Sequence, residues 1–317
     1  MSRRGTTSPR SPADRGRGGA DQVVAVAPEA FRFRPVTVVI GTLVALGMVV
    51  LVPLGLRLID TGGGPVAVIA QAWPLAGLAG AASLIVDRGT TAVVLAALYA
   101  AVTVALAVAA AERLWRRRSL APAEVAVLTA MVSPSVAGIS LVAERGGWEL
   151  LGFDMTVLAL TVAHFHFAGF AAALIAGLIH TTVPGALSAV PPIVIPAGIA
   201  VVFVGYFTTA AVELAGTAIL TAGMLLTGWL SWREVRPLAT SRLTRVLFGI
   251  SAAALVVTML LALDWAAGHV WDAIPHPSLD VMATTHGLVN AVFFALGGLV
   301  AWRRFQRERS LGLSTAI

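Results

Sequence analysis

The sequence has no cysteine and no lysine, so all 22 of its basic residues are arginine. The absence of cysteine excludes disulfides, thiolate metal sites, iron–sulfur clusters and covalently attached c-type haem. Charge is also scarce, since only 12% of the 317 residues are charged whereas 58% are hydrophobic. With a mean hydropathy of +0.88, a chain of this length could not bury its apolar surface in a soluble fold. The composition therefore predicts an integral membrane protein whose first partner is the lipid bilayer.

The net charge of +6 does not indicate nucleic-acid binding. The arginines lie in tails and loops beside apolar segments, where such residues set membrane topology. Residues 1–34 are rich in Arg, Gly, Ser and Pro and contain no apolar run, so they resemble neither a signal peptide nor a folded domain. We expect a disordered tail over 1–34, a transmembrane domain over 35–304 and a cytoplasmic C-terminal tail over 305–317.

Apolar segments bounded by charged and turn residues predict about nine transmembrane helices, with eight to ten as the range. Backbone groups in lipid must be bonded internally, which favours an all-α polytopic helical bundle. The predicted spans are 36–59, 66–86, 90–111, 121–143, 152–180, 189–207, 209–232, 243–264 and 281–302.

Arginine placement predicts the orientation. Residues 113–118, 233–245 and 303–309 each hold four arginines, and the last six spans place all three segments on one side. By the positive-inside rule that side, with the C-terminus, is the cytoplasmic side of a bacterial plasma membrane. The first three spans would then put the arginine-rich tail outside. Either the tail is exported, or one early segment does not cross, and 66–86 is the candidate for a re-entrant or interfacial segment.

Two histidines, His164 and His166, lie one residue apart inside the fifth predicted span. Ionisable groups at that depth are costly and often mark a site for a proton, metal, cofactor or substrate. A neutral imidazole can enter the bilayer and still offer a lone pair. Residues two apart on a helix point about 200° apart, so the two rings cannot face one partner.

Four ionisable side chains from three spans are predicted to share the outer half of the membrane: His164, His166, Glu213 and His286. Thr161 precedes His164 by one turn and is placed to bond its ring. Asn290 follows His286 by four residues and shares its face. Both are candidates for the supporting partners that a ligating imidazole needs, as is Glu213. The alternative interpretation is that these histidines are neutral and only form hydrogen bonds between helices.

Three motifs resemble the YndJ-like family of bacterial integral membrane proteins. They are LTVAHFHFAGF at 160–170, THGLVN at 285–290 and, more weakly, SVAGISL at 135–141. The resemblance implies a multi-pass membrane fold over most of the chain after the tail. It does not imply a mechanism.

A second, local resemblance is to histidine helices of haem-copper oxidase subunit I. It rests on VAHFHF at 162–167 with GLIH at 177–180, and on TTHGLVNAVFF at 284–294. It implies that His166 and His286 are ligands of a b-type haem or a transition metal, with His164 facing a second site. The motifs occur in reversed order and the paired histidines of the oxidase copper site are missing, so an oxygen-reducing oxidase is not expected.

The sequence therefore leaves two alternative functions. The first is a haem- or metal-binding protein that moves electrons or senses a small molecule, with His164, His166 and His286 as cofactor ligands. The second is a proton-linked or small-solute transporter that uses the same histidines and Glu213. No catalytic residue is predicted, because HFHF is not the HExxH zinc-protease pattern and no nucleophile arrangement is recognisable in the spans. The sequence leaves the oligomeric state open.

Overall fold

The structure is a computed structural model that describes residues 35–59, 64–271 and 273–314. The predicted tail over 1–34 and the last residues of the C-terminal tail lie outside the described residues. Within the described residues, helices and turns form the whole fold apart from one isolated bridge between Leu150 and Phe153. The all-α prediction is thus confirmed.

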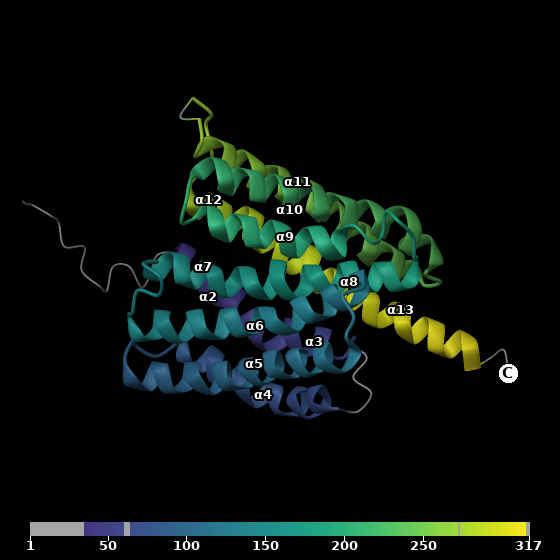
Figure 1. Cartoon of the computed structure of the whole chain (residues 1–317), viewed down its shortest axis with the longest axis horizontal. Coiled ribbons are helices and arrows are strands. Elements are labelled where there is room, and N and C mark those ends of the chain that lie inside the picture. Colours follow the sequence, from purple (N-terminus) through teal and green to yellow (C-terminus); the bar gives the residue numbers. More distant parts are fainter. Residues whose placement is uncertain (1–34, 60–63, 272, 315–317) are drawn as a thin grey trace, which may run out of the picture.

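The helices run back and forth along a common direction (Figure 1). The first is built from α2 (Pro35–Leu46), the π-helical segment η2 (Gly47–Leu51) and α3 (Val52–Leu56). Next come α4 (Pro65–Ser83), α5 (Thr90–Arg117) and α6 (Pro122–Gly146). The fifth comprises α7 (Met155–His164), π-helical η3 (Phe165–Ala172) and α8 (Ala173–Thr182).

Four further helices complete the bundle. They begin with α9 (Pro191–Gly205), followed by α10 (Ala210–Leu230), which continues through π-helical η4 (Ser231–Val235) into the 3-10 turn η5 (Arg236–Leu238). The next is α11 (Arg242–Gly268). The last is interrupted, with α12 (Leu279–Met282), π-helical η6 (Ala283–Gly287), π-helical η7 (Asn290–Leu296) and α13 (Gly297–Ser314).

Among the described residues, eight helices are long and apolar enough to cross a membrane, and each coincides with a predicted span. The remaining predicted span, 189–207, is the short helix α9 of 15 residues. At 1.5 Å per residue α9 is about 22 Å long, less than the roughly 30 Å of a hydrocarbon core. Pro191 and Pro192 fix where it begins.

The segment suspected of being re-entrant is a continuous helix. Pro74 lies within α4 on its exposed side, and the helix continues through it. Trp73 is fully buried, and its indole N–H donates to the carbonyl of Met48 at 2.9 Å. Helix α4 is long and apolar enough to cross a membrane, and whether it is re-entrant or interfacial stays a prediction.

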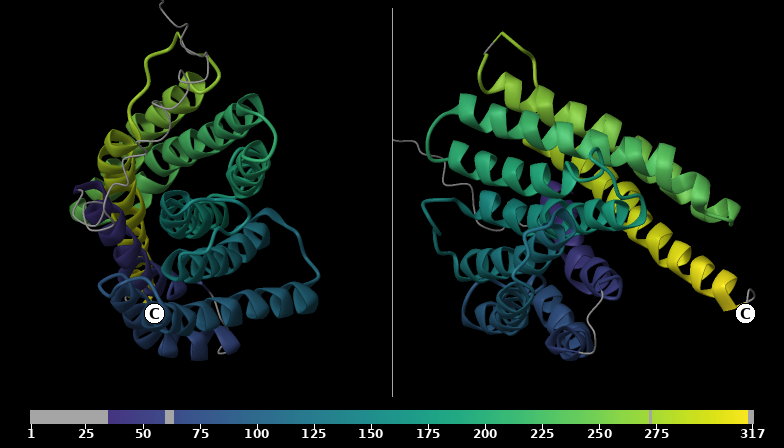
Figure 2. Two further views of the ribbon diagram at one scale, coloured as in Figure 1. Left: turned by 90° about the vertical axis from the view of Figure 1, so that its left-hand side faces the viewer. Right: turned by 45° about the vertical axis from the view of Figure 1, so that its right-hand side comes forward.

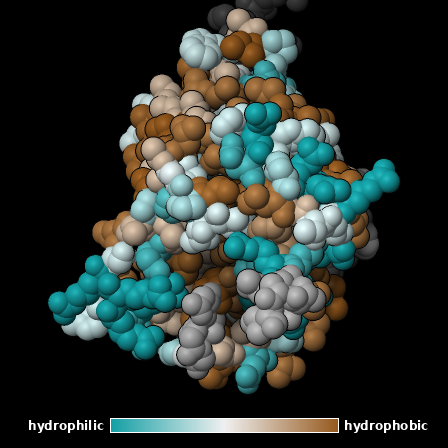
Figure 3. Space-filling view, turned by 90° about the vertical axis from the view of Figure 1, so that its right-hand side faces the viewer, coloured by the Kyte–Doolittle hydropathy of each residue, from teal (hydrophilic) through white to brown (hydrophobic). Residues whose placement is uncertain are grey.

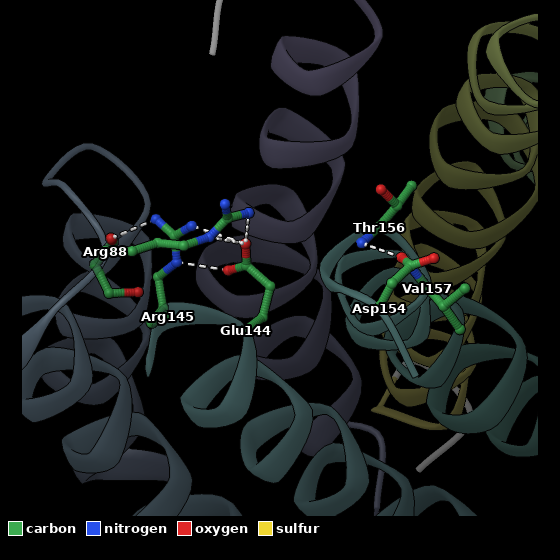
Figure 4. A network of polar contacts seen from close by, with 7 residues as sticks. Arg88, Glu144, Arg145, Asp154, Thr156 and Val157 are labelled. Carbon is green, nitrogen blue, oxygen red and sulfur yellow. Dashed lines mark hydrogen bonds and ion pairs between the residues drawn. The ribbon is translucent and has the colours of Figure 1, made fainter. Parts of the chain in front are cut away.

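The fifth helix forms the centre of the bundle. In its most apolar stretch 78% of the residues are buried, against 28–56% in the other seven long helices. Figure 2 shows this teal helix surrounded by an arc of the others. Asp154 begins it by accepting bonds from the backbone N–H groups of Thr156 and Val157 (Figure 4), a standard N-cap. The predicted histidine pair thus lies on the most enclosed helix of the molecule.

An ion network fastens one end of the bundle (Figure 4). Glu144 is buried and accepts hydrogen bonds from both Arg88 and Arg145, and Arg145 also donates to the carbonyl of Ser83. A buried carboxylate of this kind needs such partners, because an unpaired charge in the interior is costly. The network places the turn after α4 and the end of α6 together, so α4 and α6 end at the same side.

The opposite end carries the three arginine-rich segments. The ends of α5 and α13 and the start of α11 lie toward this side (Figure 1). Glu308 of α13 accepts from Thr240 and Ser241, which joins the last helix to the start of α11. The grouping agrees with the predicted boundaries, whereas its cytoplasmic orientation remains a prediction. The described chain begins and ends at opposite ends of the bundle.

Candidate functional site

Three π-helical segments from three different helices meet in the bundle interior. Segments η2, η3 and η7 each contact the other two. A π-helical turn widens the helix and weakens its own hydrogen-bond ladder, and such turns occur often at functional sites. Here outside donors bond the carbonyls of two of them, because Trp73 donates to Met48 in η2 and Ser251 donates to Phe294 in η7.

His166 lies in η3 and is completely buried. Its Nδ1 is 2.7 Å from the carbonyl oxygen of Val162, and its Nε2 is 2.5 Å from the hydroxyl of Tyr99 on α5. A carbonyl can only accept, so Nδ1 carries the proton and Nε2 accepts from Tyr99. Both nitrogens of this neutral ring are therefore satisfied.

Gly47 of η2 allows the first helix to approach this ring. A methyl group at Gly47 would lie 2.7 Å from Cγ of His166, a distance that real side chains do not tolerate. The glycine is needed because the backbone of one helix passes directly over the imidazole of another. His166 is thus enclosed by Tyr99 at its Nε2 edge and by the backbone at Gly47 near its Cβ and Cγ.

His286 has a different environment on the last helix. Its Nδ1 is 2.7 Å from the backbone carbonyl of Thr258 on α11, and the amide nitrogen of Asn290 lies 3.2 Å from its Nε2. Asn290 Oδ1 in turn lies 2.9 Å from the hydroxyl of Thr258. The same hydroxyl is also 2.9 Å from the carbonyl of Ala254. The chain His286–Asn290–Thr258 therefore ends in one hydroxyl with two acceptors.

His164 is exposed and points to yet another side. Its Nδ1 lies 2.9 Å from the carbonyl of Leu160, so this nitrogen carries the proton, and Nε2 is left as the free lone pair. His164 interacts electrostatically with His286. The structure therefore brings His164 and His286 near each other, whereas His166 faces Tyr99. Different partners for His164 and His166 are what the 200° between them predicts.

Two other predicted residues have different partners from those expected. Thr161 donates its hydroxyl to the carbonyl of Val157 and not to His164. Glu213 lies in the first turn of α10, close enough to His269 for an electrostatic interaction, and its backbone packs on Gly205 of α9. Its contacts are thus with α9 and His269, not with His164, His166 or His286.

The residues present do not fit a bis-histidine haem between His166 and His286. The Nε2 of His166 accepts from Tyr99, its Nδ1 is bonded to the Val162 carbonyl, and Gly47 lies against the base of the ring. Both nitrogens of His286 also have partners, Nδ1 in the Thr258 carbonyl of α11 and Nε2 in Asn290 on its own helix. Across the described part of the chain, no group of three or more His, Asp or Glu side chains could hold a metal ion. The two rings thus present no lone pairs to a common space.

A comparison with known protein families identifies the family of the chain. The model of the YndJ-like protein family matches residues 42–294. The chain belongs to the YndJ-like family. No curated protein and no solved structure matches it significantly. The YndJ-like region includes every residue of the two histidine environments, from Gly47 to Asn290.

Sequence reasoning missed three residues of this YndJ-like site: Gly47, Tyr99 and Thr258. One signal was present for Tyr99, which is one of only two tyrosines and lies in the middle of an apolar span. Gly47 and Thr258 have no such signal, because glycine and threonine are common in membrane helices for packing alone.

Proposed function

We propose that this YndJ-like protein is a proton-linked membrane transporter, with His286 as its proton-binding group and His164 as the exposed imidazole that exchanges protons with it. One observation carries the proposal. The single hydroxyl proton of Thr258 has two acceptors at equal distance, Asn290 Oδ1 and the Ala254 carbonyl, each 2.9 Å away. This surplus lets the hydrogen-bond chain accommodate His286 with or without an added proton.

In the neutral state every polar atom of the chain has a partner. His286 donates Nδ1–H to the Thr258 carbonyl, and its Nε2 accepts from the amide N–H of Asn290. Asn290 Oδ1 then accepts the hydroxyl proton of Thr258. Each bond has donor and acceptor in the right place, so the neutral ring is stable in the bundle.

A proton added to Nε2 requires the other arrangement. The carboxamide of Asn290 turns by 180°, so that Oδ1 accepts from the new Nε2–H and the amide N–H donates to the oxygen of Thr258. The hydroxyl of Thr258 then donates to the Ala254 carbonyl, which lies at the same distance. One proton has been gained, no covalent bond other than N–H has formed, and every group remains paired.

His164 supplies the route to His286. Its Nε2 has no hydrogen-bond partner among the described residues and its ring is not covered by the rest of the fold, while its Nδ1–H is bonded to the Leu160 carbonyl. Because two cationic rings within electrostatic range repel, protonation of one favours release by the other. Proton exchange between these two imidazoles is the transport step of the proposal.

The π-helical segments support the same function. Transporter sites near the middle of the membrane commonly use interrupted helices, whose loosened backbone can rearrange around a bound ion or solute. His286 belongs to η6 and Asn290 begins η7. The proton-binding pair therefore lies on the most interrupted helix of the described chain.

Proton flux in liposomes tests the proposal. Purified protein is reconstituted with a pH dye inside the vesicles, and a potassium gradient with valinomycin makes the interior negative. The wild-type chain is expected to acidify the interior faster than empty vesicles do. His286→Gln keeps an amide in place of the ring but cannot hold the proton, so the rate falls by at least about tenfold.

His180→Gln is the matched control. His180 bonds Ser188 near the other end of the fifth helix and takes no part in the proton relay formed by His164, His286, Asn290 and Thr258. The proton flux of this variant therefore stays at the wild-type rate. Wild-type vesicles that behave like empty ones, or His286→Gln vesicles that behave like wild type, would overturn the proposal.

A further inference from the structure

Three arginines gather in an open pocket at the arginine-rich end of the bundle. The pocket has a volume of about 440 Å³ and is lined by Arg57, from the turn after α3, and by Arg303 and Arg307 of α13. Arg303 and Arg307 are four residues apart and share one face of the helix. Figure 3 looks at this end of the molecule, where hydrophilic side chains gather among apolar ones.

No carboxylate of the described residues neutralises this cluster. None of the ion pairs among them involves Arg57, Arg303 or Arg307. The nearest acidic residue along α13, Glu308, is engaged with Thr240, Ser241 and Thr244 at the start of α11. Asp60 lies outside the described residues, and a single carboxylate would still leave the cluster positive.

Such an arrangement is unfavourable without an anion. Arg303 is half-buried and interacts electrostatically with both Arg57 and Arg307, all three of which carry positive charge. Guanidinium groups bind phosphate oxygens in a bidentate manner, and a phosphate brought between them replaces repulsion with attraction. Basic pockets between transmembrane helices at the cytoplasmic surface bind anionic lipid headgroups for this reason.

We propose that Arg57, Arg303 and Arg307 form a binding site for an anionic phosphate group, supplied by a lipid headgroup or by a soluble phosphate compound. Gln306, which also lines the pocket, adds an amide N–H donor. The bound phosphate joins the first and last helices at this end. This site is independent of the proton relay, and its test does not use proton flux.

Two binding measurements on the full chain in detergent test the site and distinguish its sources. Native mass spectrometry follows the binding of phosphatidylglycerol against phosphatidylcholine at equal concentration. Thermal unfolding compares inorganic phosphate with chloride at equal ionic strength. The variants are Arg57→Gln and Arg307→Gln. Both arginines are exposed, so we expect both variants to fold.

Arg309→Gln is the matched control, because Arg309 lies two residues from Arg307 on the opposite face of α13 and stacks on Phe305. Preferred binding of phosphatidylglycerol that weakens about fivefold in Arg57→Gln and in Arg307→Gln, but not in Arg309→Gln, supports a lipid headgroup. Stabilisation by inorganic phosphate that is lost in the same two variants, without a lipid preference, supports a soluble phosphate compound. If Arg307→Gln and Arg309→Gln are indistinguishable in both measurements, the site does not exist.

Discussion

His166 and His286 differ in how many proton arrangements their partners allow. Both rings donate Nδ1–H to a backbone carbonyl at 2.7 Å and accept at Nε2. For His286 the acceptor chain runs through Asn290 to a hydroxyl with a second acceptor. For His166 it stops at Tyr99, whose hydroxyl has no other hydrogen-bond partner among the described residues.

The partners at Nε2 decide whether a buried imidazole can accept a further proton without leaving a polar group unpaired. A proton added to Nε2 of His166 would leave the hydroxyl proton of Tyr99 with no acceptor in a fully buried position, at a cost of about 1–3 kcal/mol. The same proton on His286 leaves nothing unpaired. We therefore interpret His166 as a fixed packing element and His286 as the group that changes state.

The largest expected effect comes from disrupting the close contact between Gly47 and His166. Gly47→Leu brings its Cβ within 2.7 Å of Cγ of His166, so the first and fifth helices must separate. We expect the free energy of unfolding to fall by at least about 3 kcal/mol, the upper part of the range for overpacked cores. Thermal unfolding in detergent and the yield of monodisperse protein measure this loss.

Gly41→Leu in the same helix is the control, since a side chain there meets nothing within 4 Å. Equal stability of the two variants would mean that the close approach at His166 is not needed.

The second effect removes only the hydroxyl partner of His166. Tyr99→Phe leaves Nε2 unpaired in a fully buried site, which lowers the free energy of unfolding by about 1–3 kcal/mol. Proton flux per folded molecule stays at the wild-type rate, because this ring takes no part in the relay. Tyr206→Phe, at a half-exposed tyrosine, is expected to change neither quantity.

A loss of flux in Tyr99→Phe at unchanged stability would reverse the assignment of the two histidines.

The third effect breaks the His286 relay at its centre. Asn290→Leu keeps the side-chain volume but removes the amide that serves both states of the ring. We expect proton flux to fall by about tenfold, equivalent to a barrier higher by about 1.4 kcal/mol, while stability falls by about 1 kcal/mol. Gln71→Leu, at an exposed amide in α4, is the control and leaves the flux unchanged.

The smallest expected effect comes from removing the Thr258 hydroxyl, which has two acceptors. Thr258→Val keeps the shape of the side chain and removes the hydroxyl that changes acceptor. Flux is expected to fall by about threefold, less than 1 kcal/mol in the barrier, because Asn290 can still turn. Thr227→Val is the control, since the hydroxyl of Thr227 bonds only the Gly223 carbonyl.

Equal flux in Thr258→Val and Thr227→Val would show that the second acceptor of Thr258 has no role.

The spans were predictable because the cost of placing an arginine or a turn in lipid is local. Arg113, Arg233 and Arg303 therefore mark where the apolar part of a span ends, whereas the helices themselves continue to Arg117, Leu238 and Ser314. Prolines within the spans did not mark breaks, since α4 continues through the exposed Pro74 and α6 continues through the buried Pro134.

Within the site, only contacts along one helix could be predicted. The pair His286 and Asn290 follows from a four-residue spacing, and the structure contains their hydrogen bond. Tyr99 and Thr258 bond histidines 67 and 28 residues away, so their roles depend on the order of helices around the bundle. Glu213 illustrates the same limit, because its neighbours Gly205 and His269 depend on how the helices are arranged around the bundle.

The short helix α9 has a consequence for the surrounding lipid. It exposes Ile193, Phe203 and Val204 over a length of about 22 Å, beside neighbours long enough for a full bilayer. Acyl chains that meet this flank must shorten or tilt, because mismatch between helix and hydrocarbon thickness is relieved by local thinning. The bilayer around the protein would then be thinner beside α9 than beside the longer helices, with the headgroups of the two leaflets closer together on that one side.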